Sequence, residues 1–292
     1  MPKAFVGLFA RSYVAGETAE AALTVAQKLN SQGFDATLDI LGEHVKSAEE
    51  AASIADAYAG LYHEIARLDL NANISLKPTH LGLDIDYDTC KRNLFKVLDA
   101  AAETSNFLRI DMENSPHTDD TLTLYQHSLE RYPRVGPVLQ AYLYRSTEDL
   151  ARLMSSPLNF RLCKGIYRES PDIAIQDRAA INENFLGLLR QSFEGSAYIA
   201  IATHDQDLIR QSEELIRVMD IPISRFDFQV LYGVPMDGTL EVLRDRGYKV
   251  RIYIPFGEAW YAYALRRAQE NPNLVGYIFS NFVRRITTRA AN

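Results

Sequence analysis

The sequence predicts an α/β fold: a (β/α)8 barrel forming one domain across residues 1–292, with a short N-terminal segment (1–20) and a C-terminal helix. Eight short β-prone runs recur every 23–37 residues, and patterns typical of helices separate them. Strands that alternate with helices of this length form parallel βαβ units, and eight units in about 250 residues are typical of such a barrel. A doubly wound open sheet is the alternative, but it usually has fewer strands and a glycine fingerprint.

The predicted strands are rich in β-branched and aromatic residues. In chain order they are ATLDIL (36–41), NISLKPT (73–79), FLRIDME (107–113), PVLQAYLY (137–144), FRLCKGIY (160–167), AYIAIATH (197–204), FDFQVLYG (226–233) and KVRIYIPFG (249–257). The helical patterns between them include residues 48–68, 90–103 and 206–219.

Several of these runs alternate between polar and apolar residues, whereas barrel strands covered on both faces are usually apolar throughout. Side chains alternate across a strand, so one face of each such run is polar. The polar positions include Ser75, Lys77, Thr79, Arg109, Asp111, Glu113, Gln140, Tyr142, Asp227, Gln229, Arg251 and Tyr253. The apolar positions, which we expect against the surrounding helices, include Ile74, Leu76, Leu108, Ile110, Phe226, Phe228, Val250 and Ile252. The interior of the barrel is therefore expected to be polar.

A polar interior needs internal partners or a ligand, because an unpaired buried charge is costly. One interpretation is an ion-pair network, for instance Arg109 with Asp111 or Glu113. We favour a cavity for a large ligand, because the polar residues gather toward the carboxyl ends of the strands, where barrel active sites lie.

Two positions near the ends of predicted strands have several interpretations each. Lys77 fits a Schiff-base lysine, a clamp for a ligand, or one half of a buried ion pair. Asp111, with Glu113 two residues on, fits a group that orients this lysine or an active-site tyrosine, or the other half of the same pair.

The segment RLCKGIY carries two cations and a glycine, Arg161, Lys164 and Gly165, where a strand meets a loop. This combination suits a phosphate or pyrophosphate, although a structural role fits it equally well. His204 in ATHD (202–205) is, taken alone, more typical of a structural histidine, and Cys163 of a small core residue.

The segment YALRRAQENPN (263–273) places Arg266 and Arg267 side by side with Glu270 on a predicted helix. Arg266 and Glu270 fit a surface pair four residues apart, which contributes little stability. Two guanidiniums at the open end of a barrel would instead clamp a carboxylate. The following stretch (274–289) is amphipathic, and we predict a last helix that docks on the barrel rather than on a membrane surface.

Composition argues against several function classes. The formal net charge of −7 does not favour nucleic-acid binding. The two cysteines form no CxxC pair and the six histidines show no HxH or HxxxH spacing, so we expect a reducing compartment and no metal site. We expect no signal sequence, because the apolar run near the start is short and Arg11 interrupts it. No run of about 20 apolar residues occurs, and no GxGxxG fingerprint indicates a Rossmann site.

Taken together, these motifs resemble bacterial proline dehydrogenase, both the monofunctional enzymes and the equivalent domain of the bifunctional proline catabolic enzymes. The resemblance covers nearly the whole chain in order, and its most specific element is the spacing Tyr–x12–Arg–Arg–x–x–Glu. The motifs that carry it are RSYVAGE, ISLKPTHLGLD, RIDMENSP, VLQAYLYR, RLCKGIYRE, ATHD, FDFQVLYGV and RIYIPFGEAWYAYALRRAQENPN. One departure is Ile166, at a position where the family usually has alanine.

The resemblance implies a distorted (β/α)8 barrel that binds FAD non-covalently at the carboxyl ends of its strands. The implied flavin contacts are Met112, Gln140, Arg161, Lys164, Gly165, Ile166, Thr203 and His204. The implied proline-binding residues are Lys77, Tyr253, Arg266, Arg267, Glu270 and Leu231, with Tyr167 nearby. The implied catalytic group is Asp111, Arg161, Lys77 and Tyr253.

The implied reaction oxidises L-proline to Δ1-pyrroline-5-carboxylate, the first step of proline catabolism. A hydride passes from proline C5 to flavin N5, and a quinone then receives the electrons. The resemblance also implies a cytoplasmic protein with a peripheral contact at the inner face of the membrane. Two other interpretations of the same residues are a Schiff-base lyase that uses Lys77 or Lys164, and a barrel that senses an amino acid without turnover.

Overall fold

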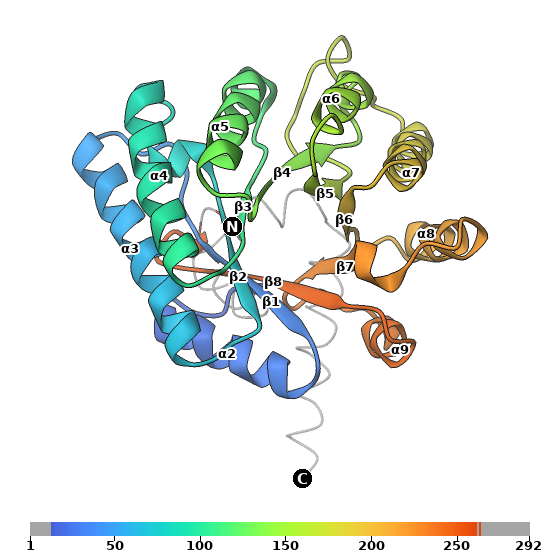
Figure 1. Cartoon of the computed structure of the whole chain (residues 1–292), viewed down its shortest axis with the longest axis horizontal. Coiled ribbons are helices and arrows are strands. Elements are labelled where there is room, and N and C mark those ends of the chain that lie inside the picture. The colour runs from blue at the N-terminus through green and yellow to red at the C-terminus, as the bar shows by residue number, and fades with distance from the viewer. Residues whose placement is uncertain (1–12, 262, 264–292) are drawn as a thin grey trace, which may run out of the picture.

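The structure, a computed structural model, describes residues 13–261 and residue 263. Its strands close into a barrel in chain order, with every neighbouring pair parallel (Figure 1). They are β1 (Asp35–Ile40), β2 (Ala72–Leu76), β3 (Leu108–Ile110), β4 (Val135–Gln140), β5 (Asn159–Cys163), β6 (Tyr198–Ala202), β7 (Phe226–Leu231) and β8 (Val250–Phe256).

The helices surround this barrel (Figure 1). The α-helices are α2 (Ala19–Ser31), α3 (Ala48–Arg67), α4 (Tyr87–Glu103), α5 (Thr118–Arg131), α6 (Ser146–Leu153), α7 (Arg178–Glu194), α8 (Gln206–Val218) and α9 (Thr239–Asp245). The 3-10 helices are η1 (Pro78–Leu81), η2 (Ser115–His117) and η3 (Ile223–Arg225).

The predicted (β/α)8 barrel is confirmed. Each β-prone run contains a strand, and the helical patterns at 48–68, 90–103 and 206–219 fall within α3, α4 and α8 with small differences at their ends. The described part of the helix expected after β8 begins around Trp260. The predicted final helix at 274–289 lies outside the described residues, as do Arg266, Arg267 and Glu270.

The apolar faces of the strands also lie as predicted. Ile74, Leu108, Phe226 and Val250 are buried in the main hydrophobic cluster, between the strands and the helices around them. The opposite, polar faces therefore point into the interior of the barrel, here called the lumen.

Five polar positions that the sequence placed on strands lie beyond the strand ends: Lys77, Thr79, Asp111, Glu113 and Tyr142. Thr79 is in η1, and its N–H and hydroxyl donate to the Glu113 carboxylate at 2.9 and 2.6 Å. Tyr142 follows β4 and packs with Leu143 and Ala174. The β-prone runs continue into the loops after the strands, because those loops are themselves buried and partly apolar.

Side-chain caps fix where helices begin after the strands. The Ser47 hydroxyl accepts a hydrogen bond from the N–H of Glu50 at 3.1 Å and starts α3. The Asp205 carboxylate accepts from the N–H groups of Asp207 and Leu208 and starts α8. These caps satisfy N–H groups that have no partner within the helix. Each cap marks the end of a loop that follows a strand. The face of the barrel formed by these loops, at the carboxyl ends of the strands, is here called the mouth of the barrel.

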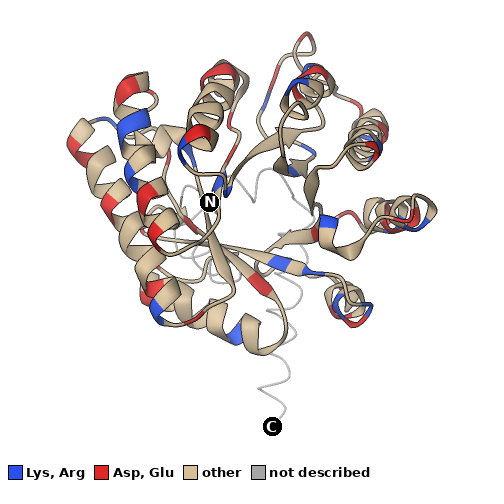
Figure 2. Ribbon diagram, in the orientation of Figure 1, with Lys and Arg blue, Asp and Glu red and all other residues tan. Residues whose placement is uncertain are grey.

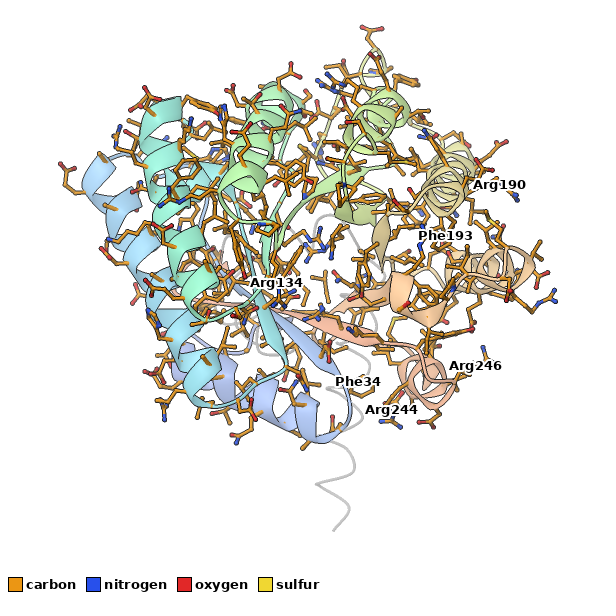
Figure 3. The ribbon with its side chains drawn as sticks, in the orientation of Figure 1. Phe34, Arg134, Arg190, Phe193, Arg244 and Arg246 are labelled. Carbon is orange, nitrogen blue, oxygen red and sulfur yellow. The ribbon has the colours of Figure 1, made fainter. Side chains whose placement is uncertain are left out.

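An N-terminal helix covers the seam at which the barrel closes. β1 and β8 pair from Asp35–Arg251 to Ile40–Phe256, and α2 packs against both strands. Beside this seam, the Arg244 guanidinium of α9 lies 5.2 Å from the ring centroid of Phe34 (Figure 3). Backbone pairing thus joins the first and last strands, and side chains of α2 and α9 cover them.

Positive and negative side chains are interspersed along the surrounding helices on the side shown in Figure 2. Among the described residues, no helix has the length and apolar character needed to cross a membrane. Nor do the described histidine, cysteine, aspartate and glutamate side chains include a group of three or more arranged to bind a metal ion.

Candidate active site

A cavity of about 520 Å³ lies at the mouth of the barrel. This volume is in the range of sites for small molecules and cofactors, roughly 300–1,000 Å³. Its lining includes every predicted site residue that the structure describes: Lys77, Asp111, Met112, Gln140, Arg161, Lys164, Gly165, Ile166, Thr203, His204, Leu231 and Tyr253. Residues far apart in the sequence therefore meet in one place because parallel barrel strands end at the same face.

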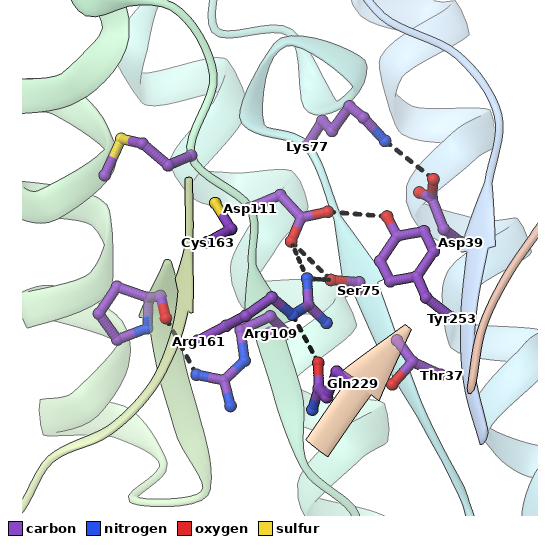
Figure 4. Close-up of polar contacts among 12 residues, drawn as sticks. Thr37, Asp39, Ser75, Lys77, Arg109, Asp111, Arg161, Cys163, Gln229 and Tyr253 are labelled. Atoms are coloured by element: carbon purple, nitrogen blue, oxygen red, sulfur yellow. Dashed lines mark hydrogen bonds and ion pairs between the residues drawn. The ribbon is translucent and has the colours of Figure 1, made fainter. Parts of the chain in front are cut away.

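Asp111 is the centre of the hydrogen-bond network beneath this cavity (Figure 4). One carboxylate oxygen accepts hydrogen bonds from Arg161 Nη1 and Ser75 Oγ, each at 2.7 Å. The other oxygen accepts from the Tyr253 hydroxyl at 2.8 Å. Of the roles that the sequence left open for Asp111, orienting a tyrosine is the one that this contact with Tyr253 supports.

Arg161 crosses the lumen from β5 and connects several strands. Its Nε donates to Gln229 Oε1 of β7 at 2.7 Å, and Nη1 also lies 3.2 Å from Ser75 Oγ of β2. The guanidinium lies 5.0 Å from the ring centroid of Tyr253. Arg161 is 7% exposed, so its charge is balanced inside the lumen, chiefly by Asp111.

Tyr253 is held as a hydrogen-bond donor. Burial raises the pKa of the Tyr253 phenol well above its ordinary value, and the negative charge of Asp111 raises it further. The hydroxyl group consequently stays protonated, and its hydrogen points to Asp111.

Lys77 forms an ion pair with Asp39, a residue that the sequence interpretation did not select. Lys77 Nζ lies 2.9 Å from Asp39 Oδ2 (Figure 4). Burial by itself lowers the pKa of Lys77, but the nearby carboxylates, Asp39 first among them, raise it above the ordinary lysine value. Lys77 is therefore a cation. A Schiff-base lysine instead needs a lowered pKa, so its environment does not favour that role.

Lys164 and Gly165 form part of the cavity wall after β5. Lys164 Nζ lies 2.6 Å from Asp205 Oδ2, which joins the loop after β5 to the cap of α8. Gly165 has φ +107°, and a Cβ atom there would lie 2.2 Å from the Tyr142 ring. Only glycine fits this backbone conformation and this close approach.

His204 and Gln140 are oriented by backbone groups. The N–H of Leu231 donates to His204 Nε2 at 2.8 Å, so Nε2 is an acceptor and, in the neutral ring, Nδ1 carries the hydrogen. Gln140 Nε2 donates to the carbonyl groups of Met112 and Glu113 at 3.2 and 2.8 Å. These two hydrogen bonds fix the orientation of the Gln140 amide. Its oxygen, Oε1, is buried and has no partner among the described residues.

The alternative interpretation, in which Arg109 pairs with Asp111 or Glu113, does not hold. Arg109 instead donates to the backbone carbonyls of Pro137 and Asn159 and to the Asn159 side chain, at 2.6–2.9 Å. It points toward the amino ends of the strands, because Gly136 leaves room for it: a Cβ there would lie 2.5 Å from Arg109 Nη1.

Sequence reasoning missed other residues of the cavity. Asp39 is one, although its position after Thr37 in ATLDIL follows the same polar alternation as the strands that were recognised. Glu43 and Tyr263 also line the cavity. Tyr263 belongs to the predicted helix after β8, whereas Glu43 lies in a loop without a regular pattern. Asp39 could have been found from its strand parity, but the position of Glu43 depends on how the loop after β1 bends over the mouth.

The residues around the cavity fit a flavin nucleotide. The unpartnered Gln140 Oε1 is a buried acceptor that suits the ring N–H donor of a flavin, and Lys164 presents a cation for a diphosphate. Ile166, at the position of the family departure, is 43% exposed and contributes apolar surface beside them.

Comparison with protein families gives an independent finding. The family model described as proline dehydrogenase matches residues 22–278. Proline dehydrogenase 1 of Bacillus subtilis is 35% identical over 278 residues, which is 95% of this chain and 92% of that protein. Proline dehydrogenase of Deinococcus radiodurans is 32% identical over 280 residues, which is 94% of this chain and 90% of that protein.

A solved structure has a similar architecture. The crystal structure of proline utilization A from Bdellovibrio bacteriovorus, inactivated by N-propargylglycine, matches with a TM-score of 0.83 and 26% identity. The match covers 90% of this chain and 32% of that longer protein. The barrel described above is therefore similar to one domain-sized part of that protein.

Proposed function

The chain belongs to the proline dehydrogenase family, and on that premise we propose that it is an FAD-dependent enzyme that oxidises L-proline to Δ1-pyrroline-5-carboxylate, the first step of proline catabolism. The observation that carries this proposal is that one cavity is lined by all the described residues expected to contact flavin or proline. The polar lumen beneath it supplies charges and donors in fixed positions, which supports a catalytic rather than a purely structural role.

Residues on the β3 to β6 side of the cavity would hold FAD: Met112, Gln140, Arg161, Lys164, Gly165, Ile166, Thr203 and His204. When bound, FAD supplies a hydride acceptor, N5, for the hydrogen on proline C5. The protein's share is to exclude water, fix both partners and neutralise charge. Gln140 contributes an acceptor that is already oriented by two backbone carbonyls, so little reorganisation accompanies cofactor binding.

Lys77 and Tyr253 would form the described part of the proline site, with Leu231 packing against the proline ring. Lys77 offers a positive charge to the substrate carboxylate. Tyr253, fixed by Asp111, presents its ring and a hydroxyl of known orientation. We propose that Arg266 and Arg267 complete the carboxylate clamp and that Glu270 lies near the amine, which must lose a proton before C5 can be oxidised.

We further propose a quinone as the final electron acceptor, with a cytoplasmic location and a peripheral contact at the inner face of the membrane. These parts of the proposal rest on family membership, since neither the cavity nor the surface identifies the acceptor. The rate of proline oxidation in the presence of lipid vesicles, measured once with a quinone dissolved in the vesicles and once with a water-soluble electron acceptor, compares the two acceptors directly.

The deciding experiment is an absorbance spectrum of the purified protein before and after anaerobic L-proline. We expect flavin bands that bleach when proline is added. Bands that persist would keep the cofactor and exclude proline as the substrate, as the amino-acid sensor interpretation predicts. A colourless protein that does not bind FAD would overturn the proposal. Borohydride trapping of a carbonyl substrate on Lys77 or Lys164 would then favour the lyase.

A further inference from the structure

Asp39 has an unusual position among the charged residues of the lumen. It lies on the inner face of β1 and is 1% exposed. One oxygen, Oδ2, accepts the hydrogen bond from Lys77, while Oδ1 is buried and has no partner among the described residues. The ion-pair partner of this side chain is Lys77 (Figure 4), and the Tyr253 hydroxyl also acts on its carboxylate.

Lys77 depends on this contact more than on any other. Among the described residues its ion-pair partner is Asp39, and the Lys77 side chain is 13% exposed, so water screens the pair poorly. The nearby cation Arg161 already has a carboxylate of its own, Asp111. A buried ammonium without a carboxylate tends to lose its proton, because burial penalises the charged form.

We propose that Asp39 is a positioning residue of the substrate site: it keeps the Lys77 ammonium charged and holds it at the cavity wall, ready for the carboxylate of an incoming substrate. This inference rests on the proposed function, because it assumes a carboxylate ligand at Lys77. Asp39 acts through Lys77 and needs no contact with the substrate itself.

The consequence is a specific change in proton balance when the charge of Asp39 is removed. In the native chain Lys77 is already an ammonium, so binding an anion needs no proton from solvent. In an Asp39→Asn variant, Lys77 would lose its ion-pair partner and keep only the weaker influence of Asp111 and Glu43, so we expect burial to make the resting Lys77 a neutral amine at pH 9. Binding of a carboxylate would then draw one proton from the buffer onto Nζ, forming an N–H bond and restoring the cation.

Other charged and titratable groups surround this pair and must stay unchanged in the comparison. From the elements packed around Asp39 and Lys77 they are Glu43 after β1, Tyr58 on α3, His80 in η1, Asp111 after β3 and Tyr253 on β8. Asp39 acts on two of them, Tyr58 and Tyr253, but burial is the main reason that the pKa values of these phenols are raised, so both stay protonated in the native chain and in the variant.

The test is isothermal titration calorimetry of the FAD-loaded protein at pH 9 in buffers of different ionisation enthalpy. The probe is L-tetrahydrofuran-2-carboxylate, in which oxygen replaces the ring nitrogen of proline, so the ligand charge is constant at this pH. We expect no proton uptake for the native chain and about one proton for Asp39→Asn. Between pH 7 and 9.5, Kd should stay level for the native chain and rise in the variant, approaching about tenfold per pH unit.

Two further variants separate charge from fold. Asp149→Asn removes another buried carboxylate, which pairs with Arg145 and Arg152 on α6 away from the cavity, and should bind like the native chain. The double variant Asp39→Asn with Lys77→Met removes the titrating amine and should take up no proton. If Asp39→Asn does not fold, Asp39→Ser carries the same test.

The outcomes distinguish this inference from the proposed function. In one outcome the native chain oxidises proline, and a folded Asp39→Asn variant binds the probe without proton uptake and with a Kd that does not change with pH. This outcome would overturn the role of Asp39 and leave the proposed function intact. Native chain that neither binds the probe nor is reduced by proline would overturn the proposed function and this inference with it.

Discussion

The Tyr253 hydroxyl of β8 donates a hydrogen bond to Asp111, 2.8 Å away beyond the end of β3. The same carboxylate also accepts from Arg161 of β5. A single side chain therefore positions a phenol and a guanidinium that come from different sides of the barrel. The positions of Tyr253 and Arg161 in the candidate site therefore both depend on the Asp111 carboxylate.

Replacing Asp111 by asparagine should destabilise the protein strongly. Arg161 is 8% exposed at its side chain and would lose its carboxylate, and breaking a buried pair costs about 3–5 kcal/mol. Urea denaturation measures this loss. The control is Asp119→Asn, whose carboxylate is 82% exposed and pairs with Arg145, and which should change the free energy of unfolding by less than about 1 kcal/mol. Equal losses in both variants would contradict the central role of Asp111.

The Arg267→Met variant should bind proline poorly and still retain FAD. Each charged hydrogen bond to a carboxylate contributes about 1.5–3 kcal/mol, so KM for proline should rise roughly 10- to 150-fold. Steady-state kinetics and the ratio of flavin to protein absorbance give both quantities. Arg217→Met on α8, whose guanidinium is 72% exposed, is the control. An unchanged KM would exclude the clamp.

Lys164→Met should weaken FAD binding, because it removes the cation expected to face the diphosphate. We expect the Kd for FAD to rise roughly tenfold or more, measured by quenching of flavin fluorescence on reconstitution. The matched control is Lys96→Met, which removes a half-exposed lysine that pairs with Asp56 between α4 and α3. FAD affinity equal to that of the control would show that Lys164 serves only its ion pair with Asp205.

His80 should make the protein less stable in acid. Burial, aided by the charge of Lys77, lowers the pKa of His80 to about 4. The unfolded chain, with an ordinary histidine pKa of about 6.5, therefore binds more protons than the folded chain between these values, and the free energy of unfolding falls as pH falls. Between pH 7 and pH 4.5 the histidine alone should remove about 2.5 kcal/mol.

The His80→Asn variant isolates this contribution. Chemical denaturation at the two pH values should show a smaller loss of stability in the variant than in the native chain. His63→Asn replaces a 56% exposed histidine and should keep the native pH dependence. A native-like pH dependence in His80→Asn would indicate that other groups cause the acid sensitivity.

The fold was predictable because two periodicities agree in the sequence. The spacing of β-prone runs indicates the barrel, and the alternation within runs such as RIDME indicates which side chains enter the lumen. Asp111 and Gln229 followed from that alternation, and both contact Arg161, which the sequence singled out separately as a cation in RLCKGIY. The alternation continues to Asp111, one residue past β3, but not to Tyr142, which lies in a turn two residues past β4.

Partners of charged residues were harder to predict than their positions. Lys77 and Asp111 lie on neighbouring segments, yet the ion pair of Lys77 is with Asp39 on the other side, and that of Asp111 is with Arg161. Pairing depends on the register between strands and on the reach of each side chain, which a single sequence does not contain. The arginine clamp lies outside the described residues and stays a prediction.

The position of Arg161 bears on how the protein acquires its structure. Its guanidinium on β5 contacts Ser75 and Asp111 from the first half of the barrel and Gln229 from the second. Either half made alone would contain buried charges without their partners. Duplication or recombination at the midpoint would therefore separate groups that stabilise one another, so this barrel is expected to fold and to diverge as an indivisible, cooperative unit.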